Sequence, residues 1–550
     1  MNYIERFIKE MRDPKQRKLF GAIFAGKLIG VGLCFLVMFG ISVYFSSTAK
    51  VHAQDTPPAA PAPNAAPAAA APATSAPAAP AAPAAPTAAP AAAPAAPADA
   101  AAAAPPPPPN PPYVNPINTM WVLVTAFLVF FMQAGFMFLE AGFSRTRESV
   151  NVMLEGIVDT SLCGILFYCW GFAWMFGHGN GFIGHGDADG HSWYCLQNLP
   201  ETYEATGVAT LAIFLFQFAF ADTCSTITSG AMVGRTGFWG DLWYSIGVSG
   251  FIYPIFGHWA WGPDGWLNAI PFWKAAPFHD FAGSTVVHTI GGMIALAGAI
   301  VLGPRLGRVF KRDGGGPMPG HNMLIASVGA IILWFGWYGF NPGSTLSAMD
   351  ILGVARVATN TTLAACSGGL AALFYVYPRS KKWDCGMTLN GLLAGLVAIT
   401  CPCYWVSPFG AIALGAVAGV LVVLGTDLLE WLRIDDPCGA WPVHGLCGIW
   451  GTLSLGLFAT GQFGAPTPTG ADVTTKDILV KGLFYGGGTD QLVAQVIGNA
   501  SIGIGVFVVA MILMYLVKLT GTLRVSKEGE LEGLDLHEHG GHAYPEQVHQ

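Results

Sequence analysis

The stretch Asp280-Phe-Ala-Gly-Ser-Thr-Val-Val-His288 has a counterpart further along the chain, Asp436-Pro-Cys-Gly-Ala-Trp-Pro-Val-His444. Both follow the pattern D-x-x-G-x-x-x-V-H, and each opens a long apolar run. Eight residues of helix rise about 12 Å, and the hydrocarbon core of a bilayer is about 30 Å thick. If each aspartate lies near a membrane surface, each histidine lies near the middle of the membrane, where an ionisable residue indicates a functional site.

The composition is typical of a polytopic membrane protein. Mean hydropathy is +0.49, and only 11% of the 550 residues are charged, too few for an ordinary soluble chain. The 70 glycines suit closely packed transmembrane helices. A net charge of −7 gives no basic surface for nucleic acid.

The N-terminal part differs from the rest of the chain. Residues 1–53 begin with many basic residues and continue with an apolar run, which predicts a signal peptide cleaved after Ala53 or a retained anchor helix. Residues 54–115 are mostly alanine and proline, which predicts a disordered linker, because proline blocks regular helix. The expected membrane domain covers 116–520, and a tail of 521–550 follows.

The membrane domain contains eleven apolar runs, which predict eleven transmembrane helices. They cover 118–143, 152–176, 206–231, 238–262, 281–303, 322–341, 351–377, 386–403, 408–431, 444–460 and 490–517. Basic residues cluster after the odd-numbered runs, as Arg305 and Arg308 do after the fifth. We expect the protein in the cell inner (plasma) membrane. By the positive-inside rule, the N-terminus of the bundle lies outside and its C-terminus lies in the cytoplasm. An odd number of helices requires the same arrangement.

This orientation turns the two related motifs into an inverted repeat. Asp280 then starts the fifth helix at the outer face, and Asp436 starts the tenth helix at the inner face. The fold class is therefore an all-α polytopic membrane protein in which helices one to five are repeated, inverted, by helices six to ten. His288 and His444 would approach each other at the repeat interface, and a long eleventh helix would lie outside the repeat.

Several motifs resemble those of the ammonium transporter (Amt/Mep/Rh) family, in its bacterial Amt branch. They are FFMQAGFMFLEAGF (130–143), HDFAGSTVVH (279–288), GWYGFNPGS (336–344), DDPCGAWPVHGLCGIWGT (435–452) and LEGLDLHEHG (531–540). The resemblance covers about 121–545. It implies a homotrimer with one pore per subunit that moves ammonium or ammonia, with no enzymatic activity, cofactor or metal.

The resemblance also assigns roles to single residues. His288 and His444 match the paired pore histidines, and Trp337 and Phe340 match the pore wall. Phe216 and Phe220 match an outer gate, while Phe220, Trp261 and Ser344 match the ammonium site at the outer mouth. Asp280 matches the acidic residue of the fifth helix. By their own position, Asp280 and Asp436 are expected to cap helices by accepting backbone N–H groups.

Two cytoplasmic features bear on regulation. The tail resembles a family segment that packs on neighbouring subunits and docks PII-class signalling proteins, and its Leu531, Leu534 and Leu536 are expected to cover a surface. The family pattern after the third helix is A-E-R, whereas this chain has Val233-Gly234-Arg235. The missing carboxylate predicts weaker contacts on the inner face.

The residues also suggest how the pore would work. Apolar walls with two imidazoles cannot replace the hydration of a bare cation, so they favour passage of neutral ammonia after loss of a proton. Alternatives are an Rh-like gas channel, an ammonium sensor that works through a partner protein, and a membrane cytochrome with haem between facing histidines. Asp222, inside the third run, is expected to make structural hydrogen bonds. Cys195, Cys401 and Cys403 are candidates for a disulfide.

Overall fold

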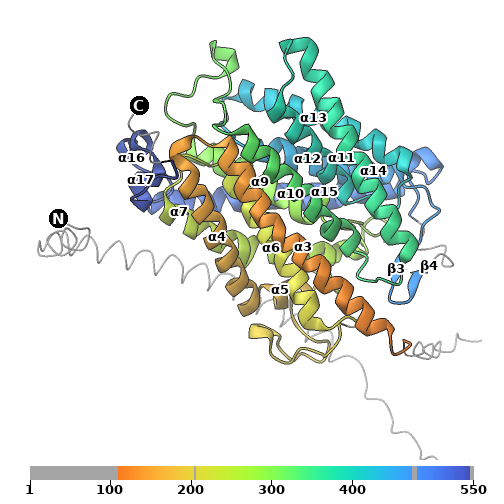
Figure 1. The fold of residues 1–550 in the computed structure, drawn as a ribbon. Coiled ribbons are helices and arrows are strands. Elements are labelled where there is room, and N and C mark those ends of the chain that lie inside the picture. Colours follow the sequence, from red (N-terminus) through yellow and green to blue (C-terminus); the bar gives the residue numbers. More distant parts are fainter. Residues whose placement is uncertain (1–109, 204–205, 275, 473–479, 545–550) are drawn as a thin grey trace, which may run out of the picture. The chain divides into compact units, whose positions relative to one another are not determined.

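The computed structural model describes residues 110–203, 206–274, 276–472 and 480–544. The signal peptide or anchor predicted over 1–53 and nearly all of the linker predicted over 54–115 lie outside the described residues. Within them, the first helix, α3, begins at Val114. The described chain forms a bundle of long helices with two short hairpins in its loops (Figure 1).

The helices and strands follow the apolar runs closely. The long or medium helices are α3 (Val114–Phe143), α4 (Ser149–Leu166), α6 (Thr210–Gly230), α7 (Phe238–Gly247), α8 (Tyr253–Trp261), α9 (Ile290–Leu302), α10 (Met323–Gly343), α11 (Ile351–Ser380), α12 (Cys385–Thr400), α13 (Pro408–Leu432), α14 (Cys447–Phe458) and α15 (Asp490–Leu519). The short elements are α5 (Phe172–Phe176), α16 (Lys527–Glu532), α17 (Leu534–His539), β1 (His178–Asn180), β2 (Ile183–Gly186), β3 (Ala465–Thr467) and β4 (Gly470–Asp472).

Eight helical segments of the described chain are long and apolar enough to cross a membrane. They are Val114–Phe143, Thr146–Phe176, Thr210–Gly230, Ser284–Leu302, Met323–Gly343, Ile351–Ser380, Pro408–Leu432 and Asp490–Leu519. Three further predicted runs correspond to helical segments at 238–261, Cys385–Thr400 and 441–458, which do not meet the same criteria of length and composition. The fold is thus a helical polytopic membrane bundle, and the count of eleven spans stays a prediction.

Side-chain caps fix where several helices begin. Asn322 accepts hydrogen bonds from two backbone N–H groups in the first turn of α10, and Asp384 accepts one at the start of α12. Ser407 caps α13, whose first residue is Pro408. A proline at this position costs no hydrogen bond, because the first N–H groups of a helix have no partner within the helix.

Four π-helical turns interrupt the regular helices. They are η2 (Phe167–Gly171), η4 (Val248–Ile252), η6 (Ser284–Thr289) and η8 (Trp441–Leu446). The first two join α4 to α5 and α7 to α8, and the last two open α9 and α14. Turns of this kind are rare and occur frequently at functional sites. Here η6 contains His288 and η8 contains His444.

The two histidine-bearing segments pack reciprocally. Helix α9, which follows η6, contacts η8, and α14, which follows η8, contacts η6. The contact is close because it involves glycine: a Cβ placed on Gly292 would overlap the backbone of Gly445. Elsewhere α3 runs alongside α10. Both contacts pair elements that the predicted repeat relates to each other.

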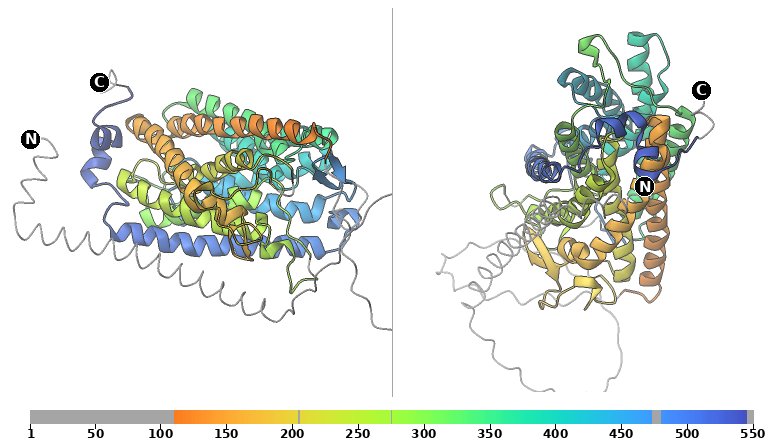
Figure 2. Two further views of the ribbon diagram at one scale, coloured as in Figure 1. Left: turned by 90° about the horizontal axis from the view of Figure 1, so that it is seen from below. Right: turned by 90° about the vertical axis from the view of Figure 1, so that its left-hand side faces the viewer.

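The two ends of the bundle carry different elements. The short helices α16 and α17 lie at one end, where α17 contacts α4, and the β3–β4 hairpin lies at the other (Figures 1 and 2). Helix α15 runs along one edge of the bundle, as the left panel of Figure 2 shows. Its last residue, Leu519, is followed by the tail.

Candidate functional site

The two D-x-x-G motifs have the same local structure. Asp280 accepts hydrogen bonds from the backbone N–H groups of 283–286, at 2.8–2.9 Å. Asp436 accepts from those of 439–441, at 2.9–3.0 Å. Gly283 and Gly439 have φ of 109° and 74°, a left-handed conformation that favours glycine. Each aspartate thus caps the π-helical turn that carries its histidine.

Both capping carboxyl groups are enclosed by protein. Burial raises the pKa of Asp280 above its ordinary value, although four backbone N–H donors favour the charged form. Burial likewise raises the pKa of Asp436, to about 6, although the backbone N–H groups and the nearby charge of Arg235 act to lower it. The donors therefore hold each carboxylate in place without making it strongly acidic.

The two histidines meet inside the bundle. Their Nδ1 atoms lie 3.2 Å apart, within hydrogen-bonding distance, and their rings stack with centroids 5.3 Å apart. One Nδ1 must carry a hydrogen and the other must accept it. His288 is fully buried, and its Nε2 has no hydrogen-bond partner among the described residues. The pair therefore offers unused nitrogen to a small molecule that can form hydrogen bonds.

An aromatic column connects the histidines with the end of α8. The ring of His288 stacks on Trp337 and Phe340, at centroid distances of 5.2 and 5.4 Å. Phe340 stacks on Phe220 at 4.0 Å, and Trp261 meets Phe220 edge-on at 6.1 Å. All of these rings except Trp261 are fully buried.

Phe220 has two phenylalanine partners, one of which the resemblance does not pair with it. The resemblance pairs Phe216 with Phe220 as a gate and assigns Phe340 to the wall. Phe216 does contact Phe220, with tilted rings 4.7 Å apart. The closer, stacked partner of Phe220 is Phe340, which comes from α10 rather than from the same helix. Because Phe340 also stacks on His288, the Phe220–Phe340 pair lies directly before the histidines.

The polar groups near Trp261 are held by backbone contacts. The indole N–H of Trp261 donates to the carbonyl of Asp280 at 2.8 Å, which joins α8 to the first D-x-x-G motif. The hydroxyl of Ser344 donates to the carbonyl of Phe340 at 2.8 Å, so its lone pairs remain free to accept. Trp261 and Ser344 are both half-buried. This part of the column is therefore accessible and carries an acceptor beside aromatic faces.

A small cavity lies on the other side of His444. Its volume is about 20 Å³, which is enough for one molecule the size of water. Phe136, Ile227, Val443 and His444 line it together with Glu140. Glu140 accepts a hydrogen bond from Ser229 at 3.2 Å. Sequence reasoning missed this glutamate, although it lies within the motif FFMQAGFMFLEAGF.

Two smaller expectations concern Asp222 and the cysteines. Asp222 is fully buried, and Thr160 and Gln133 lie beside its carboxyl group as side-chain donors, although neither contact has good hydrogen-bond geometry, so its structural role stays a prediction. Cys195, Cys401 and Cys403 are all free. Cys401 and Cys403 are buried, whereas Cys195 is exposed and its thiol faces the carbonyl of Cys169 at 3.8 Å. The three are therefore not bonded to one another.

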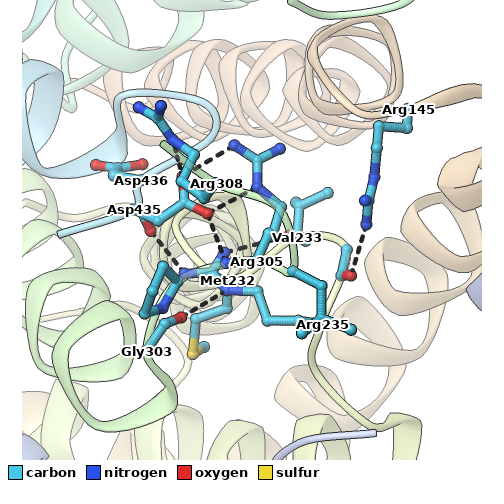
Figure 3. Close-up of polar contacts among 12 residues, drawn as sticks. Arg145, Met232, Val233, Arg235, Gly303, Arg305, Arg308, Asp435 and Asp436 are labelled. Atoms are coloured by element: carbon cyan, nitrogen blue, oxygen red, sulfur yellow. Dashed lines mark hydrogen bonds and ion pairs between the residues drawn. The ribbon is translucent and has the colours of Figure 1, made fainter. Parts of the chain in front are cut away.

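A buried cluster of charges closes the end of the bundle that carries the tail (Figure 3). The carboxylate of Asp435 accepts two hydrogen bonds from the guanidinium of Arg305, at 2.8 and 2.9 Å, and one from Arg308 at 3.2 Å. Arg235 donates to the backbone carbonyl of Asp435 at 2.6 Å. Burial alone would raise the pKa of Asp435, but the bonds to Arg305 and the charge of Arg235 outweigh it and hold the pKa well below its ordinary value.

A second ion pair, beside this cluster, explains the glycine at 234. Gly234 has φ of 83°, and a Cβ added to it would come within 2.8 Å of the carboxyl group of Glu148. Glu148 pairs with Arg145, which also donates to the carbonyl of Gly234 at 3.0 Å. A carboxylate therefore stands beside residue 234, supplied by another part of the chain. Whether the inner contacts are weaker than in relatives with the acid stays a prediction.

The tail is attached to this end by buried contacts. Glu530 accepts from the backbone N–H of Leu306 at 2.6 Å and from Arg524 at 2.7 Å. Asp535 accepts from the N–H of Asn151 at 2.9 Å. Of the three leucines expected to cover a surface, only Leu534 is buried, while 60% of Leu531 and 38% of Leu536 are exposed. Within one chain, therefore, Leu531 is mostly exposed and Leu536 is only partly covered.

Known proteins are similar to this chain in sequence and in fold. The model of the Ammonium Transporter Family matches residues 120–544. Ammonium transporter Amt2 of Archaeoglobus fulgidus is 42% identical over 437 residues, which are 78% of this chain and 88% of that protein. A solved structure titled Sensor Amt Protein has a TM-score of 0.68 and 35% identity, covering 78% of this chain and 99% of that one. Mep2 of Candida albicans has a TM-score of 0.67 and 27% identity, covering 78% and 90%.

Proposed function

This chain belongs to the ammonium transporter family and transports ammonium across a membrane, and we propose that it recruits the ion at Trp261 and Ser344 and passes ammonia along the two histidines. The observation that carries this proposal is the aromatic column, which ends on two histidines whose Nδ1 atoms lie 3.2 Å apart. The column is buried and apolar, so a neutral molecule crosses it far more easily than an ion does.

Recruitment uses the half-buried end of the column. Ammonium is a cation with four N–H donors. The free lone pairs of Ser344 accept one of them, and the faces of Trp261 and Phe220 attract the charge by about 0.5–2 kcal/mol. The stacked rings of Phe220 and Phe340 stand between this site and His288, so they must separate for a molecule to pass. We therefore assign the gate to Phe220 and Phe340, with Phe216 packed behind Phe220.

Selectivity follows from the loss of a proton. Potassium has no proton to lose, and the column offers no ring of oxygen atoms to replace its water. Ammonia that passes the gate meets the unpartnered Nε2 of His288 and then the ring of His444, each of which exchanges hydrogen bonds with it. The cavity below His444, with Glu140 in its wall, then receives one molecule at a time.

The orientation follows from the charges at the tail end of the bundle. Arg145, Arg235, Arg305 and Arg308 gather there beside the tail, and the positive-inside rule assigns this end to the cytoplasm. In this arrangement, the segments 238–261, Cys385–Thr400 and 441–458 complete eleven spans. The protein is then a multi-pass protein of the inner (plasma) membrane whose bundle begins outside.

The exposed leucines of the tail support an assembly. Leu531 and Leu536 lie at the surface of one chain, and neighbouring subunits of a homotrimer would cover them. A PII-class signalling protein is the regulatory partner that we propose for this face. The tail would report its binding to the pore through the buried contacts of Glu530 and Asp535.

One experiment tests transport itself. Purified protein in liposomes is exposed to an ammonium jump while the internal pH and the current are recorded. A transporter moves ammonium with saturable kinetics, whereas the alternative, a sensor that works through a partner protein, binds ammonium without moving it. An Rh-like gas channel would move ammonia at a rate that does not depend on Trp261 or Ser344.

The first prediction concerns the outer site. Trp261→Leu removes a cation–π partner worth about 0.5–2 kcal/mol and should weaken the apparent affinity for ammonium by about 2- to 30-fold, or raise the maximal flux by loosening a tight site. The measurement is the concentration dependence of uptake. Trp273→Leu is the matched control, because Trp273 also donates its indole N–H to a backbone carbonyl, that of Asp490. Unchanged kinetics in Trp261→Leu would remove Trp261 from the site.

The second prediction concerns the tail. Deleting residues from Gly521 onward should change the transport rate or abolish binding of a PII-class protein, while the bundle stays folded, because the apolar helices end at Leu519. Uptake, pull-down with purified PII protein and gel filtration measure the three properties. A truncated protein with normal uptake and normal partner binding would show that the tail has no regulatory role.

A further inference from the structure

Three polar stripes face one another inside the bundle, away from the aromatic column. Their members recur at intervals of three or four residues, so each stripe occupies one face of a helix. The stripes consist of Asn151, Glu155 and Asp159 on α4, of Asp222, Ser225 and Ser229 on α6, and of Asp241, Ser245 and Ser249 on α7 and η4. All nine residues are buried, and α4 contacts both α6 and α7.

Most polar atoms of the stripes make no hydrogen bond of good geometry among the described residues. Both carboxyl oxygens of Asp159 and of Asp222 are unpartnered, as is one oxygen each of Glu155 and Asp241. The other oxygen of Asp241 accepts from the hydroxyl of Tyr244. The hydroxyl groups that stand between the carboxyls, on Ser225, Ser245 and Ser249, are unpartnered too. Several of these groups nevertheless lie beside one another, as Asp159 does beside Ser245 and Asp241, so small side-chain movements or bridging waters would connect them.

Neighbouring groups of the three stripes, which together we call the tract, lie near one another. Asp159 lies beside Ser245 and Asp241, and it is also near Asp222. Glu155 lies beside Asn151 and near Asp241. From Asn151 to Asp159 the α4 stripe rises about 12 Å. Asp222, at the far end, follows the gate residue Phe220 by two positions on α6.

The other end of the tract reaches the tail. The backbone N–H of Asn151 donates to Asp535 at 2.9 Å, and its side-chain oxygen lies 2.8 Å from Nε2 of His539. Asp535 is fully buried and keeps one oxygen unpartnered. His539 is half-buried. The tract therefore ends in a carboxyl group and an imidazole at the cytoplasmic end of the bundle.

The chemistry of the tract identifies its occupant. The charged groups that act most strongly on Glu155 and Asp159 are other carboxyl groups, Glu140 included, and none of the ion pairs formed by the described residues involves the four carboxyl groups of the tract. Several unpaired negative charges in a low-dielectric interior are very costly, so these groups hold protons. A protonated carboxyl and a hydroxyl each both donate and accept hydrogen bonds. A row of such groups can pass a proton along.

We propose that the tract is a proton path, separate from the histidines, which connects Asp222 on α6 with Asp535 and His539 at the tail. Each step breaks one O–H bond and forms an O–H or N–H bond on the next carboxyl, hydroxyl, imidazole or bridging water. A bridging water carries the proton past Asn151, whose amide cannot relay it, and no electron is transferred. This goes beyond ammonium transport, because it gives the protein a route by which protons exchange with the cytoplasm without entering the ammonia route.

Infrared difference spectroscopy of the protein in lipid bilayers tests the proposal. At neutral pH the wild-type protein should show the carbonyl stretch of protonated carboxyl groups, and part of this band should be lost in Asp159→Asn and another part in Asp222→Asn. After transfer to D₂O the band should shift as the protons exchange. In Asp159→Asn the contribution of Asp222 should remain but exchange at least about tenfold more slowly, as an added barrier of ~1.4 kcal/mol requires.

Asp350→Asn is the matched control. Asp350 is buried but fully bonded, to the backbone N–H of Gly353 and the hydroxyl of Tyr404, so its replacement should leave the exchange of the Asp222 band unchanged. Ser245→Ala, which removes only a hydroxyl, serves if Asp159→Asn does not fold, and it should slow the same exchange. The proposal is overturned if the wild type lacks the band, if the band appears only after removal of sodium and potassium, or if exchange of Asp222 is equally fast in the variants.

Discussion

A His288→Asp or a His444→Asp variant is expected to lose its selectivity for ammonium over potassium, or to stop conducting. Each substitution puts a carboxylate into a buried column that now holds neutral rings. Carboxylate oxygens can replace part of the water around a bare cation. Potassium would therefore find oxygen ligands that the wild-type column does not offer. We expect the ratio of ammonium to potassium flux to fall at least about tenfold, since that needs only ~1.4 kcal/mol.

The measurement is ion flux into liposomes, with each cation supplied in turn. His185→Asp controls for the substitution itself, because the side chain of His185 is exposed on β2. His288→Asn separates charge from hydrogen bonding, because it keeps a polar group without adding a negative charge. The histidine pair would have no part in selectivity if both aspartate variants moved ammonium normally and still excluded potassium.

The second large effect is expected at the buried cluster of Figure 3. Asp435→Asn keeps the size of the side chain but leaves Arg305 and Arg308 without their shared counter-charge. Breaking a buried ion pair on one side costs about 3–5 kcal/mol, so the variant should unfold at a clearly lower temperature or fail to accumulate. Thermal unfolding of the solubilised protein measures the loss.

Asp313→Asn is the matched control, because Asp313 also forms two hydrogen bonds with one arginine, Arg433. That pair is largely exposed, so its loss should change stability little. Acid provides a second check. The pKa of Asp435 is lowered in the folded protein, so its contribution is complete above the unfolded value of about 3.9 and is lost as the pH falls further. Asp435→Asn should lack this acid-dependent loss of stability. If Asp435→Asn and Asp313→Asn were equally stable, the cluster would have no special role in stability.

The sequence was informative wherever a repeated spacing had a physical meaning. The D-x-x-G pattern predicts a carboxylate that caps a helix after a glycine turn, and the bonds of Asp280 and Asp436 have that form. Because the two motifs were expected to enter the membrane from opposite sides, the sequence also predicted that His288 and His444 would approach each other. The apolar runs likewise matched helices to within a few residues, because burial of apolar side chains sets helix length in a membrane.

Other features depend on contacts that spacing does not encode. The π-helical turns add a residue to a helix without any signature in the apolar pattern. The pairing of Phe220 with Phe340 depends on how α6 meets α10. Glu148 stands beside Gly234 from a different loop, which no inspection of the residues around 234 could reveal. The polar stripes on α4, α6 and α7 do have a readable period, but only packing shows that they face one another.

The contact between Gly292 and Gly445 has a mechanical consequence. Because these backbones touch, the spacing of the two histidine-bearing segments is set by a main-chain contact rather than by bulky side chains. Packed protein interiors have low compressibility, and a contact without side chains leaves little free volume to remove. Hydrostatic pressure should therefore narrow the outer mouth, where bulky rings meet, well before it moves these two segments closer together.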